Sequence, residues 1–253
     1  MKIGLCLLCR NEADIIVQWM EYHMRQGYDI IHVADNGSSD GTWEYLLSLR
    51  PRVSLSQIAD MSFKQSDWVY AIDDSLRKNG CDWIVNLDAD EFISGDVRVA
   101  CEIADKNSIE QLYPHGTFMR CTPEDPNIED PIRRMTWHDT WSVKYSNDKA
   151  ILHSAGLTGV CQGNHCGYWN HTAIESAAKN LYLYHYEQRS AAQLIKKYGG
   201  HHSADKLSHM GEGWRALNQL WIDGGDQALI QYWNTHCIYD TKNLEQDMTK
   251  YWS

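Results

Sequence analysis

The first 92 residues alternate between short apolar runs and amphipathic segments, and this alternation constrains the fold more than any other feature of the chain. Each apolar run of strand length is followed by a segment whose apolar residues recur at helical spacing. Such a repeat predicts a parallel sheet with crossover helices, which is an α/β fold. The predicted strands span residues 2–9, 30–34, 53–58 and 83–87, and the predicted helices span residues 13–26, 43–49 and 66–79.

Polar side chains follow three of the predicted strands. Arg10, Asn11 and Glu12 come after the first, Asp35 comes after the second, and an acidic motif at residues 88–91 comes after the fourth. Because the carboxyl ends of parallel strands meet at one edge of a sheet, ligands bind there. We therefore expect a nucleotide pocket at this edge. The chain has no GxGxxG sequence after the first strand and no Walker A sequence, so neither a dinucleotide fold nor a P-loop is indicated.

The acidic motif places three carboxylates within four residues: Asp88, Asp90 and Glu91. Like charges this close repel one another unless a cation lies between them. Hard oxygen ligands suit Mg²⁺ or Mn²⁺, and either ion suits a substrate diphosphate. The motif alone leaves open a second interpretation, a solvated acidic turn after a core strand.

The charge balance disfavours one class of partner. Asp and Glu number 34 against 23 Lys and Arg, which gives a formal net charge of -11. General nucleic-acid binding is disfavoured because phosphate contacts require clustered basic residues. The 11 Trp and 14 Tyr residues can line a sugar- or base-binding cleft, or can belong to the core.

Several features favour a cytoplasmic location, including the inner face of a membrane. The apolar run at residues 3–9 is too short for a secretory leader, and no stretch is long enough to span a membrane. The eight cysteines are expected to be reduced thiols.

The alternation weakens in the second half of the chain. Two further strands are predicted at residues 149–153 and 181–186, and the chain from Ala191 onward is predicted to be mostly helical. We therefore expect one α/β domain at residues 1–189 and a C-terminal helical extension at residues 190–253 that packs on it.

Five motifs occur in a fixed order and together resemble the family-2-like nucleotide-sugar glycosyltransferases. The resemblance is strongest to a bacterial subgroup with an Arg-Asn-Glu opening and an Asp-x-Asp-Glu-Phe core. The motifs are Cys9-Arg10-Asn11-Glu12, Trp19-x-x-Tyr22-His23, the run from Asp35 to Thr42, Asp82-Trp83 with Asp88-Ala89-Asp90-Glu91-Phe92, and His185-Tyr186 with Arg189-Ser190.

The resemblance implies a GT-A fold, with a Rossmann-like, mainly parallel mixed sheet flanked by helices. It also implies transfer of a sugar from a UDP- or GDP-sugar donor to an acceptor hydroxyl. The acceptor would be a glycan, such as lipopolysaccharide or capsule, or another hydroxyl compound.

By the same analogy, Asp90 is the direct ligand of Mn²⁺ or Mg²⁺, and Asp88 contacts the ribose or reaches the metal through water. Glu91 supports the metal or lies close to the sugar. His185 completes the metal site, with His165 as its competitor, because neutral imidazole is a suitable ligand for Mn²⁺.

The resemblance assigns the base and the ribose of the donor to the polar turn after the first strand and to Asp35. Lys149 is a candidate for a point charge facing the diphosphate. The nucleotide-binding residues expected on these grounds are Arg10, Asn11, Glu12, Asp35, Lys64, Gln65 and Asp88.

Members of this family usually invert the anomeric carbon, which requires one general base for the acceptor hydroxyl. Asp139 is the predicted base, since it lies in a cluster of aromatic residues at 137–141 that suits a sugar acceptor. Its rivals are Glu124, Asp125 and Asp130.

Two other functions compete with glycosyl transfer. An Asp-x-Asp phosphohydrolase normally has Thr or Val two residues after the second Asp, where this chain has Phe92. A non-catalytic sugar-nucleotide-binding protein is the second alternative. The role of the helical tail stays open between acceptor binding, pairing of two subunits into a homodimer, and peripheral contact with a membrane.

Overall fold

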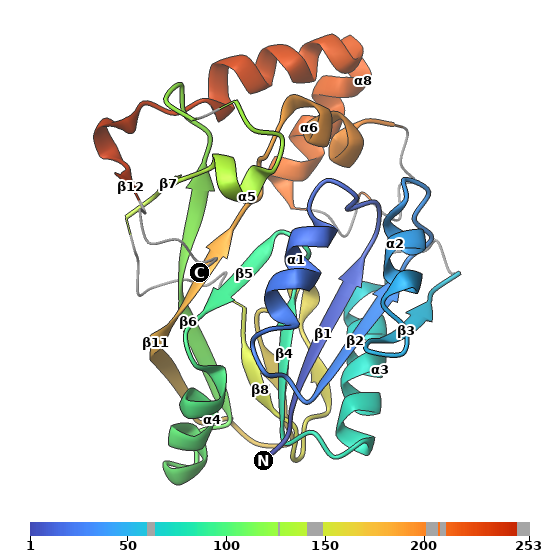
Figure 1. Ribbon diagram of the computed structural model, residues 1–253, viewed down its shortest axis with the longest axis vertical. Helices are drawn as coiled ribbons and strands as arrows, with labels where there is room; N and C mark the ends of the chain where they lie inside the picture. Colours follow the sequence, from blue (N-terminus) through green and yellow to red (C-terminus); the bar gives the residue numbers. More distant parts are fainter. Residues whose placement is uncertain (60–63, 126, 141–148, 201–206, 208–210, 247–253) are drawn as a thin grey trace. The chain divides into compact units, whose positions relative to one another are not determined.

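The computed structural model describes residues 1–59, 64–125, 127–140, 149–200, 207 and 211–246 (Figure 1). The chain forms two compact units, here called unit 1 and unit 2. Among the described residues, those at 1–117 and 149–185 belong to unit 1, and those at 118–140 and 186–246 belong to unit 2. The predicted boundary at residue 189 and the packing of the tail on the first domain stay predictions.

Unit 1 is built around four parallel strands in the order β3-β2-β1-β4. The strands are β1 (Ile3–Cys9), β2 (Ile30–Asp35), β3 (Ser54–Gln57) and β4 (Trp83–Leu87). The connecting helices are α1 (Ile16–His23), α2 (Thr42–Ser48) and α3 (Gln65–Lys78). All seven elements predicted from the alternation are therefore confirmed, with α1 shorter than expected.

The register of the parallel strands brings their polar ends to one edge of the sheet. Cys9, the last residue of β1, lies beside Asp35 of β2, and Leu7 lies beside Leu87 of β4. The turns that follow β1, β2 and β4 consequently start within about two residues of one another along the strand direction, which is where open α/β sheets bind ligands.

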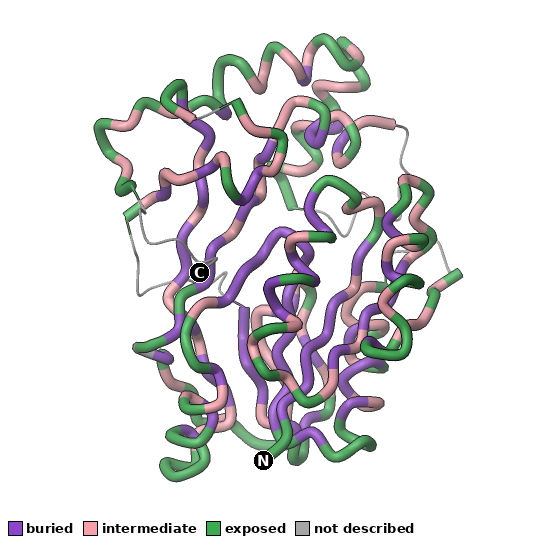
Figure 2. Tube along the Cα trace, in the orientation of Figure 1, coloured by how far each residue is buried: buried purple, intermediate pink, exposed green. Residues whose placement is uncertain are grey.

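Most residues of the central strands β1 and β4 are buried (Figure 2). Every residue of β4 is buried, as expected for a parallel strand covered by helices on both sides. On one face, α3 contributes Val69, Ile72 and Leu76 to a cluster that includes Cys6 and Ile84. This packing fixes the position of β4 and so of the acidic motif at its end.

One polar pair lies inside this packing. Asp73 of α3 is only 1% exposed, and its Oδ2 accepts a hydrogen bond from Nδ2 of Asn86 at 2.9 Å. Burial raises the pKa of Asp73 to about 7, although its hydrogen bonds from Asn86 and Cys6 oppose the shift.

Antiparallel strands extend the sheet beyond β4. β8 (Ile151–His153) pairs with β4, and β6 (Gln111–Arg120) pairs with β8. β5 (Glu91–Ser94) begins inside the acidic motif and pairs with β11 (Glu175–His185), which also pairs with β6. The strands β5 and β6 and the helix α4 (Val97–Lys106) were not predicted, and β11 begins six residues earlier than expected. Between β8 and β11, the chain forms a short hairpin of β9 (Gly159–Val160) and β10 (Gly167–Tyr168) around η1 (Gln162–Asn164).

Unit 2 contains the end of β6, which pairs with β7 (Trp137–His138), and β7 pairs in turn with β12 (Glu245–Gln246). Its helical elements are α5 (Pro131–Arg134), α6 (Ala191–Tyr198), α8 (Glu212–Tyr232), η2 (Trp233–Cys237) and η3 (Thr241–Asn243). The expected helical tail is thus confirmed, and its core joins Leu194, Tyr198, Leu229 and Cys237. Among the described helices, including the 21 residues of α8, none is sufficiently long and apolar to cross a membrane.

Candidate active site

The acidic turn, residues 88–91, connects β4 to β5 and is held by a buried tryptophan of α1. The indole Nε1 of Trp19 donates to the carbonyl oxygens of Asp88 and Glu91, at 3.0 and 2.9 Å. Within the turn, the backbone N–H of Asp88 donates to Oε2 of Glu91 at 2.8 Å. These bonds fix the backbone from which the three carboxylates project.

A buried lysine neutralises part of this charge. Lys149 is 2% exposed, and its Nζ lies 2.7 Å from Oδ2 of Asp88 and 3.6 Å from Oε2 of Glu91. Burial alone would lower the pKa of Lys149, but the charges of Asp88 and Glu91 outweigh it and raise the pKa. Burial raises the pKa of Glu91 to about 7, and the charge of Lys149 opposes this rise.

His185 reaches the acidic turn through the pairing of β11 with β5. It is the last residue of β11 and lies opposite Glu91 in the register. Its Nε2 lies 3.5 Å from Oδ1 of Asp90, and its Nδ1 lies 4.0 Å from Oε1 of Glu91. Two residues 95 positions apart in the sequence, Asp90 and His185, are therefore close in space.

The donor set at this turn fits a hard divalent ion. Asp90, 7% exposed, offers carboxylate oxygens, and His185 offers an imidazole nitrogen beside it. Within the part of the chain that the structure describes, no three His, Cys, Asp or Glu side chains converge to hold a metal by themselves. Mg²⁺-type sites commonly combine one or two protein carboxylates with substrate phosphates and water, and Asp90 supplies one such carboxylate.

The competitor of His185 lies elsewhere in unit 1. His165 follows η1, in the hairpin of β9 and β10, and its Nε2 would be 2.5 Å from a Cβ at Gly163. The carbonyl of Gly163 accepts a hydrogen bond from Nζ of Lys149 at 2.5 Å. His165 therefore belongs to the loop that holds Lys149, whereas His185 faces Asp90.

Asp35 ends β2 at the same edge of the sheet and is fully buried. Its Oδ1 accepts a hydrogen bond from the N–H of Ser38 at 3.0 Å. Its Oδ2 is buried and has no hydrogen-bond partner among the described residues. An unpartnered buried carboxylate oxygen is costly, and a ligand N–H or O–H would remove that cost.

Asn11 and Glu12 connect the turn after β1 to the turn after β2. Asn11 adopts a left-handed conformation with φ 59°, its N–H donates to Oγ of Ser38 at 2.8 Å, and its Oδ1 accepts from the N–H of Ser39 at 2.8 Å. The N–H of Glu12 donates to Oγ1 of Thr42 at 2.9 Å. These bonds shape the rim of the expected nucleotide pocket.

The structure places the other three expected nucleotide-binding residues after β1 and at the start of α3. Arg10 is exposed after β1, and Lys64 is exposed at the start of α3. Oε1 of Gln65, the first residue of α3, accepts a hydrogen bond from Nε2 of Gln162 at 2.8 Å, which joins α3 to the β9–β10 hairpin.

Asp139, the predicted general base, belongs to unit 2. Its carboxylate accepts two hydrogen bonds from Arg120, from Nε at 3.0 Å and from Nη2 at 2.5 Å. The guanidinium group of Arg120 lies over the rings of Phe118 and Tyr239, at 5.1 and 4.6 Å from their centroids. A carboxylate held in a bidentate pair must exchange that partner before it can accept a proton from an acceptor.

The three rivals of Asp139 also lie in unit 2. Asp130 caps α5 by accepting from the N–H of Ile132 at 2.9 Å, and Asp125 accepts from the N–H and Oγ1 of Thr122. Burial raises the pKa of Asp125. Oε1 of Glu124 accepts from Oγ1 of Thr241 at 3.3 Å. No described bond distinguishes one of these as the base, so the assignment to Asp139 stays a prediction.

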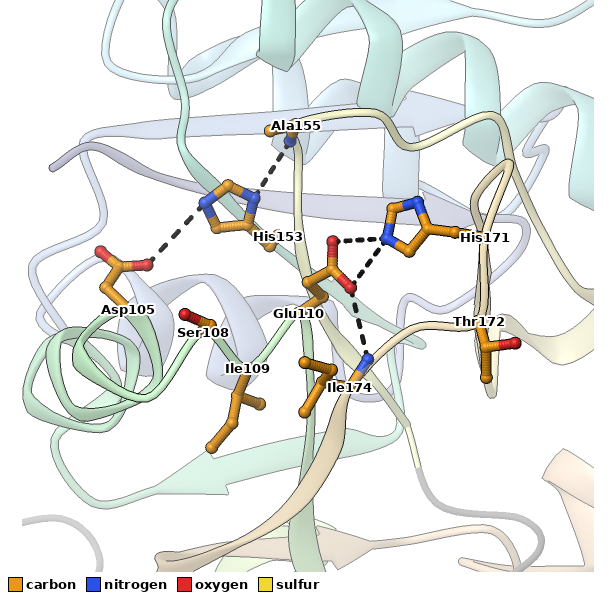
Figure 3. Close-up of a pocket in the computed structure, with 9 residues that line it drawn as sticks. All are labelled: Asp105, Ser108, Ile109, Glu110, His153, Ala155, His171, Thr172 and Ile174. Carbon is orange, nitrogen blue, oxygen red and sulfur yellow. Dashed lines mark hydrogen bonds and ion pairs between the residues drawn. The ribbon is translucent and has the colours of Figure 1, made fainter.

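A cavity of ≈ 400 Å³ lies at the opposite edge of the unit 1 sheet (Figure 3). It is lined by His153, which pairs with Trp83 at the amino end of β4, and by Glu110 and His171, whose Nε2 lies 2.9 Å from Oε1 of Glu110. No predicted site residue lines it. The chemistry of the acidic turn is therefore separate from this cavity.

The roles of two residues at the site could not be predicted from the sequence. Lys149 is predicted as a point charge facing the diphosphate, whereas the structure buries it beside Asp88 and Glu91. Trp19 occurred in a motif, but nothing in the sequence indicates that its indole N–H supports a turn about 70 residues later.

The model of one family, glycosyl transferase family 2, matches residues 5–142, which is more than half of the chain. The chain belongs to this family. Residues 5–142 of this glycosyltransferase family 2 member run from within β1 to just after β7 and include the acidic turn and Asp35, whereas Lys149 and His185 lie outside the matched region.

Solved structures similar to this family 2 chain include S. aureus TarS, with 11% identity and a TM-score of 0.50 over 92% of this chain and 55% of that chain. A glucosyl-3-phosphoglycerate synthase from Mycobacterium tuberculosis, in complex with Mn²⁺, UDP and phosphoglyceric acid, has 15% identity and a TM-score of 0.34 over 46% of this chain and 43% of that chain. The mixed sheet with its flanking helices and C-terminal helix is a GT-A fold, as the resemblance implied.

Among curated proteins, a glycosyltransferase family 92 protein from Oryza sativa subsp. japonica is 28% identical over 90 residues, which is 35% of this chain. The chain spans 15% of the length of that protein and about half of the length of TarS.

Proposed function

We propose that this glycosyltransferase family 2 member transfers a sugar from a nucleoside diphosphate donor to an acceptor hydroxyl, and that the reaction depends on Mn²⁺ or Mg²⁺. The observation that carries the proposal is the pairing of Asp90 with His185 beside Asp88, at the strand edge that also holds Asp35. Such a set offers a metal site and a nucleotide site a short distance apart along one edge.

In this proposal, Asp90 and His185 hold the metal ion, which when bound neutralises the charge that develops on the leaving diphosphate. Asp88, whose side chain is about one-third exposed, contacts the ribose or reaches the metal through water. Glu91 holds the turn by accepting a hydrogen bond from the N–H of Asp88. Glu91 also provides a buried carboxyl close to the expected position of the sugar.

The buried Oδ2 of Asp35 accepts an N–H or O–H of the base or ribose, which satisfies an oxygen that otherwise has no hydrogen-bond partner among the described residues. Arg10, the rim formed by Asn11 and Glu12, and the start of α3 at Lys64 and Gln65 complete the nucleotide pocket in this proposal. UDP and GDP are the two nucleotides to test.

In the same proposal, the reaction inverts the anomeric carbon. Asp139 acts as the general base for the acceptor hydroxyl once its ion pair with Arg120 opens. The motifs favour the bacterial subgroup, a glycan acceptor such as lipopolysaccharide or capsule, and a cytoplasmic location that includes the inner membrane face. The helical tail binds the acceptor, pairs subunits or contacts the membrane surface.

The test is thermal-shift screening of the full chain against UDP, GDP, inorganic phosphate and vanadate, with and without Mn²⁺. Metal-dependent stabilisation by one nucleotide, followed by release of that nucleotide from its sugar donor, is the expected result. A response to phosphate or vanadate alone would instead support a phosphohydrolase. Nucleotide binding without turnover of any donor would support a binding protein.

A pair of isosteric variants makes this test specific to the strand edge. Asp35→Asn replaces an acceptor oxygen with a donor amide, so stabilisation by the nucleotide should be lost. Asp82→Asn is the matched control, because Asp82 precedes β4 at the other end of the strand and accepts a hydrogen bond from the N–H of Lys2 at 2.7 Å. Equal nucleotide responses from both variants would contradict the role of Asp35.

A further inference from the structure

Lys149 is a buried cation at the acidic turn and has no assigned role in the proposed transfer. An ammonium group removed from water lowers stability unless hydrogen bonds and opposite charges compensate. Here Nζ donates to Oδ2 of Asp88 at 2.7 Å and to the carbonyl oxygen of Gly163 at 2.5 Å, and Oε2 of Glu91 lies 3.6 Å away. The side chain is therefore held from the acidic turn and from the β9–β10 hairpin together.

The backbone conformation and one backbone hydrogen bond constrain the hairpin side of this arrangement. Gly163 has φ +80°, and a Cβ there would be 2.5 Å from Nε2 of His165, so the position requires glycine. The carbonyl of Asn164 accepts a hydrogen bond from the N–H of Ala150 at 3.3 Å, which ties the hairpin to the residue next to Lys149. Lys149 consequently cannot leave Asp88 without losing its bond to Gly163 or moving the hairpin.

The position of Lys149 divides the acidic turn into two parts. Asp88 has one oxygen committed to the ammonium group, whereas Oδ1 of Asp90 lies beside Nε2 of His185 at 3.5 Å. A divalent ion approaching Asp88 has to compete with a fixed positive charge at hydrogen-bond distance, while an ion at Asp90 does not compete for the same oxygen. The lysine thus disfavours Asp88 as a metal ligand.

We infer that Lys149 is a positioning residue that withholds Asp88 from the metal ion and directs it to the nucleotide, so that tight metal binding requires the donor diphosphate. The inference rests on the proposed metal-dependent transfer. With Asp88 withheld, the ion is held by Asp90 and His185 among the described residues of the turn, and phosphate oxygens of the nucleotide supply further ligands.

The experiment is a titration of the full chain with Mn²⁺, in which electron paramagnetic resonance reports free Mn²⁺, with and without UDP or GDP. Wild-type protein should bind Mn²⁺ weakly alone and more tightly with the nucleotide. Lys149→Met should bind Mn²⁺ alone about tenfold more tightly, because the competing charge is gone and Asp88 becomes available. Lys149→Arg, which keeps the charge, should behave more like the wild type.

Two controls separate the withholding of Asp88 from a general effect of charge. Lys78→Met removes a surface lysine paired with Asp74 and should leave the affinity for Mn²⁺ unchanged. In the Asp88→Asn/Lys149→Met double variant, the gain should disappear, because no carboxylate remains at position 88 to be released.

Circular dichroism and a thermal melt establish that each variant is folded. Lys149→Gln, which is also neutral but keeps a polar end, replaces Lys149→Met if the latter does not fold. An unchanged Mn²⁺ affinity in the folded neutral variant, or a gain that persists with Asp88→Asn, would overturn the inference while leaving the proposed function intact. Absence of Mn²⁺ binding by the wild type even with both nucleotides would overturn the metal-dependent function itself, and the inference with it.

Discussion

The buried carboxyl group of Asp73 makes the stability of unit 1 depend on pH. Its carboxyl group lies between α3 and the sheet, with its hydrogen bond from Asn86, and burial raises its pKa from 3.8 to about 7. The folded state therefore holds a proton on Asp73 over a pH range in which the unfolded chain has released it. Stability contributed by this group is present at low pH and is lost as the pH rises from about 4 to about 7.

The size of the effect follows from the shift in pKa. Raising the pKa by about 3, at 1.36 kcal/mol for each pKa unit, lowers the free energy of unfolding by about 4 kcal/mol at a pH well above 7. Between pH 5 and pH 8 the same linkage gives a loss of about 2–3 kcal/mol, because part of the change already occurs below pH 5.

Asp73→Asn removes this titration with little change in volume. The new amide can accept from Nδ2 of Asn86 and donate to Oδ1 of Asn86, which is buried and has no hydrogen-bond partner among the described residues. Urea unfolding of both proteins at pH 5 and pH 8 should show that the variant loses about 2–3 kcal/mol less than the wild type over this range. Other groups, including Glu91, titrate in both proteins and cancel in the comparison. Equal losses in the two proteins would refute the assignment of a raised pKa to Asp73.

Three further predictions concern the acidic turn and the candidate base. Asp90→Asn should lower turnover by about 10³-fold while leaving the melting temperature nearly unchanged, and near-normal activity would contradict a metal role for this residue. Trp19→Phe removes the N–H that reaches the carbonyls of Asp88 and Glu91, so urea unfolding should show a loss of about 2–4 kcal/mol; a loss below about 0.5 kcal/mol would show that these bonds add little. Asp139→Asn should lower kcat by about 10²–10⁴-fold without changing nucleotide affinity if Asp139 is the base, and an unaffected kcat would transfer that role to another carboxylate.

The parallel half of the fold could be predicted because local patterns determine it. Apolar runs such as residues 83–87 are buried on both faces and appear in the sequence as nearly continuous hydrophobic segments. A glycine just after a helix, such as Gly80 after α3 with φ +84°, marks where the chain turns back. The position of Asp35 and of the acidic turn at one sheet edge follows directly from that pattern.

The antiparallel part of the fold and the full set of site residues depend on contacts between residues far apart in the sequence, which local patterns do not encode. β5 begins within the acidic motif, so its four residues look like part of a turn, and only its pairing with β11 makes it a strand. The same pairing brings His185 to Asp90. Burial of Lys149 is equally non-local, because it needs carboxylates some 60 residues earlier and a carbonyl from the hairpin that follows.

The strand order β3-β2-β1-β4 also has a consequence for how the chain folds. β1 is completed by residue 9, but one of its two neighbours, β4, ends only at Leu87. During synthesis, one edge of β1 is therefore without its partner until nearly eighty more residues have been made, and closing such a loop is slow. An exposed apolar strand edge is prone to pair with other chains. A fragment ending before Trp83 should aggregate, whereas one that includes β4 and its antiparallel neighbours should remain in solution.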